Sequence, residues 1–227
     1  MDIQFSPTRP DADTLVLAVP KGGGDALPLA AAATLAAGAA ASRFTGEAGT
    51  GFESFVEEGG RTLRVLLLGT GAGSAQDMEK AGGALVAKLA TSGATHAAVE
   101  GLNGEAAATL AFGARLRSWR FDTYRTRQSE KAKPTLKTIT IVASDADAAW
   151  ERQAALADGV AFTRELVAEP ANILYPESFV ERCRHLEQLG VKITVLDKDA
   201  MTQLGMGALL GVAQGSVREP RLLAMEW

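Results

Sequence analysis

The chain has 227 residues, 47 % of them hydrophobic and 22 % charged, with a formal net charge of −4 at pH 7. This length suffices for one large domain or two small ones with buried cores, and the small negative charge excludes bulk attraction to nucleic acid or anionic membranes. A single cysteine, Cys183, rules out an internal disulfide and fits a reducing compartment. The first 13 residues carry three acids and lack the apolar core of a signal peptide. We therefore expect a cytoplasmic location without a membrane partner.

Strand-like and helix-like runs alternate through the first 144 residues. Short apolar runs rich in Val, Ile and Leu predict strands, and the longer runs between them predict helices. The predicted strands are residues 14–20, 62–69, 95–101 and 136–144, and the predicted helices are residues 27–44, 74–91 and 105–119. Such alternation predicts a three-layer α/β domain with a mainly parallel or mixed sheet at about residues 1–144.

A long helix is predicted to follow this domain, over residues 145–169. Asp145 or Asp147 can cap its start, and Glu169 should end it because the residue before a proline is pushed out of the helical region. A helix of this length spans roughly 35 Å. We interpret it as a linker between two domains.

Residues 170–227 predict the beginning of a second α/β domain. A helix is expected to start at Pro176 and to end just before Gly190, followed by a strand at residues 191–197 and a short helix. Residues 206–216 are too rich in glycine for a good helix and too apolar for a solvated loop, and a final strand follows. Two strands that are apolar on both faces need more cover than these 58 residues supply. We expect the chain to be a piece of a larger protein.

Two glycine-rich segments follow predicted strands, where α/β proteins often bind ligands. In residues 66–74 the glycines stand at 69, 71 and 73, so the third is one residue early for the dinucleotide fingerprint, and no Walker lysine follows. A tight strand-to-helix turn with positive φ is the favoured interpretation. Residues 21–25 (KGGGD) are either a flexible loop or an anion-binding loop. A nucleotide-binding domain that uses both segments is the weakest functional hypothesis.

The segment at residues 115–137 concentrates eight basic residues with only two acids, and Trp119, Phe121 and Tyr124 are interleaved with them. This pattern suits nucleic acid or another anionic partner. The competing and favoured interpretation is an exposed connection whose aromatic rings pack inward while the basic groups stay in water. The candidate anion- or nucleic-acid-binding residues are Arg115, Arg117, Arg120, Arg125, Arg127 and Lys131.

The sequence offers no candidate catalytic residue and no candidate metal ligand. His96 and His185 are 89 residues apart. Cys183 and His185 are two residues apart on a predicted helix, so they point to different faces and cannot bind one ion together. Neither a Ser-His-Asp set nor a Cys-His set stands out.

Residues 165–227 nevertheless resemble the leucyl aminopeptidase (cytosol aminopeptidase) family, in the segment that leads into its catalytic domain. Pro170-Ala171-Asn172 matches the family's Pro-x-Asn loop, and a proline-started helix and a strand follow. Residues 204–207 (LGMG) match a family motif, and residues 211–216 (GVAQGS) match its Gly-x-Gly-Ser run with a slight departure. Tyr175 stands where the family often has a small hydroxylic residue. Upstream, residues 111–127 are similar to the family's more variable N-terminal domain, and the predicted fold suits its macro-like architecture.

The resemblance implies a metal-dependent exopeptidase that hydrolyses N-terminal residues, preferentially leucine, from peptides with two divalent metal ions, Mn or Zn. It also implies a cytoplasmic homo-oligomer, a hexamer. The metal-binding and catalytic residues of the family lie beyond the part matched here, so none is assigned to this sequence, and we expect the chain alone to be inactive. The domains are then an N-terminal macro-like domain (1–144), a linker helix (145–169) and the start of a catalytic domain (170–227), in which residues 206–216 form a packed turn. The alternative is a non-catalytic nucleic-acid-binding or assembly module that uses residues 115–137.

Overall fold

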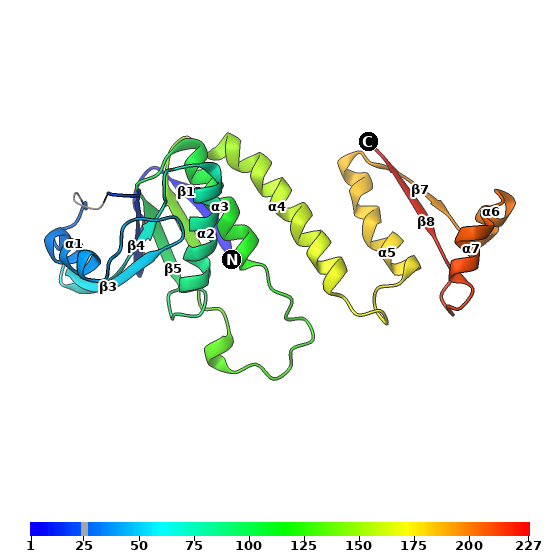
Figure 1. Cartoon of the computed structure of the whole chain (residues 1–227), viewed down its shortest axis with the longest axis horizontal. Helices are drawn as coiled ribbons and strands as arrows, with labels where there is room; N and C mark the ends of the chain where they lie inside the picture. Colours follow the sequence, from blue (N-terminus) through cyan, green and yellow to red (C-terminus); the bar gives the residue numbers. More distant parts are fainter. Residues whose placement is uncertain (24–26) are drawn as a thin grey trace. The chain divides into compact units, whose positions relative to one another are not determined.

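Five parallel strands and one antiparallel strand form a mixed sheet in the N-terminal part of the chain (Figure 1). The computed structural model describes residues 1–23 and 27–227, which divide into two compact units, Met1–Ala161 and Phe162–Trp227. The order across the sheet is β1-β6-β5-β2-β4-β3, and only β3 runs antiparallel to its neighbour. The bounds are β1 Asp2–Ser6, β2 Thr14–Val19, β3 Gly51–Glu58, β4 Arg61–Gly69, β5 His96–Glu100 and β6 Thr138–Val142.

Helices cover both faces of this sheet. Figure 1 shows α1 (Ala32–Ala41) on one side of the sheet, and α2 (Ala75–Leu89) and α3 (Gly104–Ser118) on the other. The central strands β2 and β4 are buried on both faces, because their alternate residues enter two separate cores, one under α1 and one under α2 and α3. The predicted three-layer α/β architecture with a mostly parallel sheet is thus confirmed.

The start of α2 is held by a capping box. The Ser74 hydroxyl accepts a hydrogen bond from the Asp77 amide at 3.2 Å, and the Asp77 carboxylate accepts from the Ser74 amide at 3.3 Å. The Ser74 side chain is the main cause that lowers the pKa of Asp77. The sequence spacing of these two residues therefore identified a real helix start, although Asp replaces the usual Glu or Gln.

Glycines set the distance between α2 and α3. A Cβ atom added at Gly82 on α2 would collide with the carbonyl oxygen of Leu110 on α3, and one at Gly113 would collide with the Glu79 carbonyl oxygen. The two backbones therefore approach more closely than any side chain at these positions would permit. The same two helices also carry fully buried alanines: Ala81 on α2, and Ala107, Ala111 and Ala114 on α3.

Asp13 ties the start of β2 to the start of β5. One of its carboxylate oxygens accepts hydrogen bonds from the Thr95 amide at 2.8 Å, the Thr95 hydroxyl at 2.5 Å and the His96 amide at 3.2 Å, and the other accepts from the Thr14 hydroxyl at 2.8 Å. Partial burial acts to raise the pKa of Asp13, but these hydrogen bonds, led by those from Thr95, outweigh it and lower the pKa.

Because of Asp13, the free energy of unfolding of the first unit should depend on pH in the acidic range. Since the folded-state pKa is lowered, its contribution is fully present above about pH 4 and is lost as the pH falls through the folded value. We expect Asp13→Asn to be less stable than the wild type at neutral pH and to lose less stability between pH 5 and pH 2, as measured by thermal unfolding. Thr95→Val should raise the pKa of Asp13 in an NMR titration; an unchanged pKa would contradict the assignment.

The second unit holds a two-stranded sheet and short helices. β7 (Lys192–Leu196) pairs antiparallel with β8 (Leu222–Glu226). The boundary between the units falls within the long helix α4 (Asp147–Ala168). The helix predicted from Pro176 to Gly190 consists of α5 (Pro176–Cys183) and a 3-10 segment, η2 (Arg184–Leu189), and Gly190 ends it with φ of +93°. A short helix α6 (Lys198–Gln203) follows β7. Across residues 1–23 and 27–227, no helix is long and apolar enough to cross a membrane.

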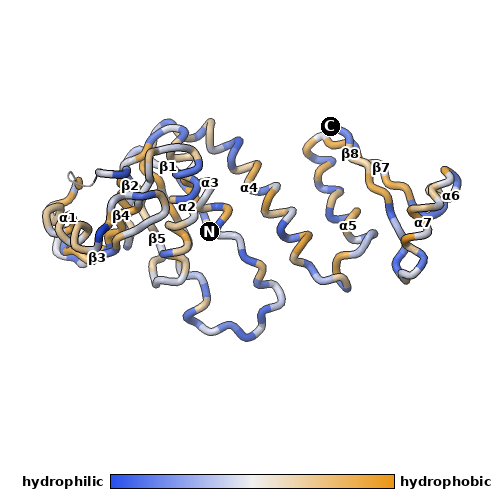
Figure 2. Tube along the Cα trace, in the orientation of Figure 1, coloured by the Kyte–Doolittle hydropathy of each residue, from blue (hydrophilic) through white to orange (hydrophobic). Residues whose placement is uncertain are grey.

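The interpretation of residues 206–216 as a turn was wrong. Gly207–Ala213 form the helix α7 rather than a turn, despite the two glycines in that stretch. No residue of α7 is buried among the described residues, and Val212 is 88 % exposed. Figure 2 colours α7 as largely hydrophobic. Strands β1 and β3 are further elements that the sequence analysis did not predict.

Candidate functional site

The glycine turn after β4 was the first candidate site, and its geometry is that of a tight turn. Gly71 and Gly73 both have positive φ, +62° and +86°. A Cβ atom at Gly71 would lie 2.8 Å from the Asp77 carboxyl carbon and 2.9 Å from the Ala48 Cβ, so the protein itself occupies the space that this glycine leaves. These glycines permit close approach of the chain to itself.

The backbone amides of residues 70–74, which a phosphate would use, all donate hydrogen bonds to acceptors of the protein itself. The Gly71 amide donates to the Gly46 carbonyl at 2.9 Å, and the Ala72 and Ser74 amides donate to the Asp77 carboxylate. Asp77 thus holds the place at the start of α2 where a bound anion would sit. A nucleotide site at residues 66–74 would require this carboxylate to leave, and the turn is therefore best explained as structural.

The second glycine segment, residues 21–25, is described only in part. The Lys21 amide donates to the Gly71 carbonyl at 2.8 Å, and the Gly22 amide donates to the Thr45 carbonyl at 3.0 Å. The Lys21 ammonium pairs with Glu47 at 2.7 Å, which raises the pKa of Lys21. Gly24 and Asp25 lie outside the described residues.

The candidate basic residues are divided among separate environments. The Arg115 guanidinium donates to the Met1 carbonyl at 3.2 Å and pairs with Asp158 at 3.1 Å. Arg120 and Arg125 share Asp122, at 2.6 Å and 3.5 Å, and the contact with Arg120 is the main cause that lowers the pKa of Asp122. Three of the six candidate basic residues are thus paired with acids, and the nucleic-acid alternative gains no support from this arrangement.

The aromatic residues of the same segment contact one another, Trp119 and Phe121 in a stacked arrangement and Phe121 and Tyr124 edge to face. The ring centroids of Trp119 and Phe121 are 6.4 Å apart, and those of Phe121 and Tyr124 are 5.7 Å apart. Trp119 and Phe121 are half-buried, whereas the Tyr124 side chain is 50 % exposed. The expectation that all three rings pack inward is therefore met only in part.

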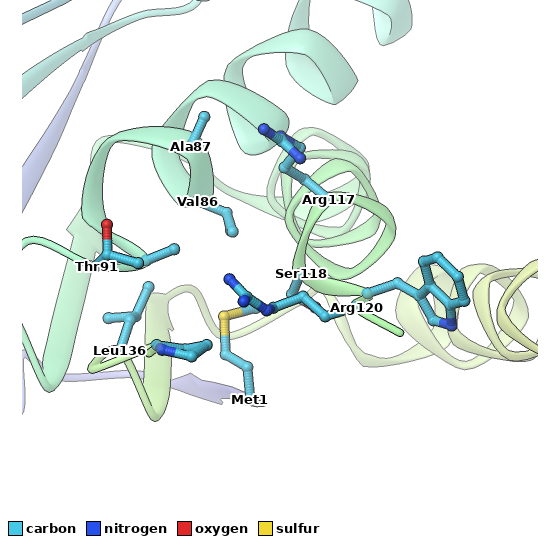
Figure 3. Close-up of a pocket in the computed structure, with 11 residues that line it drawn as sticks. Met1, Val86, Ala87, Thr91, Arg117, Ser118, Arg120 and Leu136 are labelled. Atoms are coloured by element: carbon cyan, nitrogen blue, oxygen red, sulfur yellow. The ribbon is translucent and has the colours of Figure 1, made fainter. Parts of the chain in front are cut away.

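Arg117 and Arg120 do come together, at a pocket of about 320 Å³ in the first unit. Figure 3 shows Arg117 and Ser118 at the end of α3 on one side of the pocket, and Val86 and Ala87 on α2 on the other. Met1 and Leu136 also line it, although they are far apart in the sequence. The sequence analysis singled out both arginines but could not foresee their shared pocket, because that depends on where the N-terminus and the approach to β6 lie.

The histidines and the cysteine take structural roles. The His96 Nε2 atom lies 2.9 Å from the Thr140 hydroxyl, and the His185 Nδ1 atom lies 2.7 Å from the Arg182 carbonyl oxygen. Cys183 is buried, and burial raises the pKa of its thiol. Within residues 1–23 and 27–227, no three His, Cys, Asp or Glu side chains are placed to hold a metal ion. The described part of the chain does not fit the two metal ions that the family resemblance implies.

Comparison with protein families gives two matches along the chain. A model described as "Cytosol aminopeptidase family, N-terminal domain" matches residues 18–128, and one described as "Cytosol aminopeptidase family, catalytic domain" matches residues 161–227. A protein of Caulobacter vibrioides named probable cytosol aminopeptidase is 42 % identical over 242 residues, which cover 100 % of this chain and 49 % of the relative. One of Gluconobacter oxydans with the same name is 48 % identical over 156 residues, 62 % of this chain and 32 % of the relative. The chain thus spans no more than about half the length of these relatives.

Two solved structures share the fold. A mutant of tomato leucine aminopeptidase superimposes with a TM-score of 0.78 and 21 % identity, covering 99 % of this chain and 50 % of that one. The bottromycin maturation enzyme BotP in complex with Mn has a TM-score of 0.75 and 24 % identity, covering 95 % of this chain and 45 % of that one. At these identities the likeness concerns the fold.

Proposed function

Since this chain belongs to the cytosol aminopeptidase family, we propose that it forms the N-terminal domain and the first part of the catalytic domain of an enzyme that removes N-terminal residues from peptides. The observation that carries the proposal is the match of the family's catalytic-domain model to residues 161–227, together with that of its N-terminal-domain model to residues 18–128. We place the boundaries of the domains at residues 1–144, 145–169 and 170–227.

The surface of the second unit supports the proposal that residues 170–227 are only the first part of a catalytic domain. Large apolar side chains are exposed across it: Val167, Leu189, Leu204, Leu209, Val212, Val217, Met225 and Trp227. A two-stranded sheet with short helices offers little core of its own. Exposed apolar side chains in such numbers are typical of a surface that is covered in the complete protein. We propose that further residues of the catalytic domain cover it.

The proposal includes a dependence on two divalent metal ions, Mn or Zn, and a preference for N-terminal leucine. Such ions polarise a scissile carbonyl and lower the pKa of bound water. The described residues of this chain hold no suitable ligand set. We propose, as the family resemblance implies, that the ligands lie in a part of the enzyme beyond this chain. The neighbour BotP in complex with Mn supports manganese as one candidate. A homohexamer in the cytosol completes the proposal, as the family resemblance implies.

Hydrolysis of leucine p-nitroanilide by the natural gene product tests this function. We expect a protein heavier than 23.7 kDa that hydrolyses the substrate, loses activity with a chelator and regains it with Mn²⁺ or Zn²⁺. The 227-residue chain alone should be inactive, because its described residues form no metal site. A natural product of 23.7 kDa without activity would overturn the enzymatic proposal, and activity of the short chain would overturn our placement of the catalytic residues.

A further inference from the structure

The pocket between the ends of α2 and α3 combines two guanidinium groups with an apolar wall. Its volume of about 320 Å³ lies within the range of small-molecule sites. Val86, Ala90, Leu136 and Met1 supply apolar surface, and none of the eleven described residues that line the pocket is acidic. The pocket therefore pairs positive charge with a place for a hydrophobic group.

Arg120 is held in a fixed orientation. Its Nε atom donates to the Asp122 carboxylate at 2.6 Å, and one terminal nitrogen donates to the Ala132 carbonyl at 3.3 Å. These two contacts engage one side of the guanidinium group and leave the other terminal nitrogen for a further acceptor. The carboxylate of Asp122 offsets part of the charge of Arg120, so Arg117 supplies most of the uncompensated positive charge.

Arg117 differs from Arg115, Arg120 and Arg125, each of which pairs with an acid. Across the described part of the chain it forms no ion pair, whereas Arg115 binds Asp158. Figure 3 shows the side chains of both Arg117 and Arg120 extending from the end of α3 toward α2. Basic residues in a last helical turn are favoured by the helix dipole, which accounts for Arg115 and Arg117. It does not account for Arg120, which lies beyond the helix, or for the apolar wall.

We propose that this pocket binds a small organic carboxylate with an aliphatic body. Guanidinium groups bind carboxylates through paired, charge-assisted hydrogen bonds, and the apolar wall would cover the aliphatic part. A free amino acid fits less well, because its ammonium group would lie beside two positive charges. A carboxylate of this kind is either a free short-chain acid or the C-terminal carboxylate of a peptide that ends in an aliphatic residue. The site is independent of the peptidase function proposed above.

Calorimetric titration of the 227-residue chain with 4-methylpentanoate at low salt tests the proposal. We expect saturable binding with one site per chain. The neutral 4-methylpentanamide should bind at least about tenfold more weakly, because it carries no negative charge to pair with the guanidinium groups. Leucine, which adds only an ammonium group to the same skeleton, should also bind more weakly. Acetyl-glycyl-leucine distinguishes the two sources, since binding of the peptide alone identifies a peptide C-terminus and binding of the short acid alone identifies a free acid.

Matched variants show whether the pocket is the site. Arg117→Gln and Arg120→Gln should each weaken binding about tenfold or more, and Arg127→Gln, in the same basic segment but outside the pocket, should leave it nearly unchanged. Arg117 is exposed, so its replacement tests binding without disturbing the core. The proposal fails if neither carboxylate binds, if inorganic phosphate binds as tightly as 4-methylpentanoate, or if Arg127→Gln weakens binding as much as Arg117→Gln.

Discussion

Replacing Gly82 with alanine is expected to lower the free energy of unfolding of the first unit by about 2–3 kcal/mol. The new methyl group would collide with the Leu110 carbonyl oxygen and would lie 2.8 Å from the Ala114 amide nitrogen. Both atoms belong to the backbone of α3, so the strain cannot be relieved by turning a side chain. The helices would have to separate, and the buried alanines between them would lose contact. Urea unfolding followed by circular dichroism measures the effect.

Gly83 provides a matched control on the same helix. A Cβ atom there would have its nearest neighbours at 4.0 Å, so alanine meets no obstacle. Alanine is a better helix former than glycine by about 0.8–1 kcal/mol, and Gly83→Ala should therefore stabilise the protein by up to that amount. Adjacent glycines would thus give changes of opposite sign. A stabilising or neutral Gly82→Ala would show that α2 and α3 can move apart without cost.

Removing the side chain of Arg182 is expected to make α5 detach more often from the rest of the second unit, which exposes Cys183. Its guanidinium pairs with Glu169 at 2.6 Å, and the Glu169 side chain is only 5 % exposed. Arg182→Ala leaves a buried carboxylate without this partner, which costs about 3 kcal/mol. The neighbouring Cys183 is buried and reports the opening, because its thiol reacts with a labelling reagent only when α5 leaves its place. We expect labelling to be roughly 100-fold faster in the variant.

Arg184→Ala is the corresponding control. Arg184 pairs with Glu181 at 3.0 Å on the same segment, but both side chains are largely exposed, at 47 % and 67 %. Exposed pairs of this kind contribute little to stability, and the labelling rate of Cys183 should be nearly unchanged. Equal acceleration in both variants would mean that the burial of Glu169 is not what makes Arg182 important.

The central elements could be predicted from the sequence because they are buried on both faces. The nearly continuous apolar runs of β2 and β4 are typical of strands with a core on each face. The edge strands were missed for the opposite reason. β1 and β3 each face a neighbour on one side only, and their residues are mostly half-buried or exposed. A signal for β3 was nevertheless present: Gly59-Gly60, both with positive φ, form the two-residue connection between β3 and β4.

The helix α7 and the pocket show two other limits of sequence interpretation. Glycine lowers helix propensity by only about 1 kcal/mol, so two glycines did not prevent residues 207–213 from forming a helical turn or two. The packing expected for residues 206–216 would require contacts with atoms outside the described residues. At the pocket, the arginines were recognisable from local charge, but their apolar neighbours come from residues 1 and 136 and could be placed only by the fold. Metal ligands could not be identified at all.

The position of β1 has a consequence for the order in which the protein assembles on the ribosome. β1 pairs with β6 alone, in a register that joins Asp2 to Thr138 and Ser6 to Val142. β1 therefore has no partner until β6 has been synthesised, while β2, β4 and β5 already have partners in the nascent chain. Long-range pairing of this kind is slow to form. During that interval β1 stays unpaired, and it becomes protected only when residue 142 has left the exit tunnel.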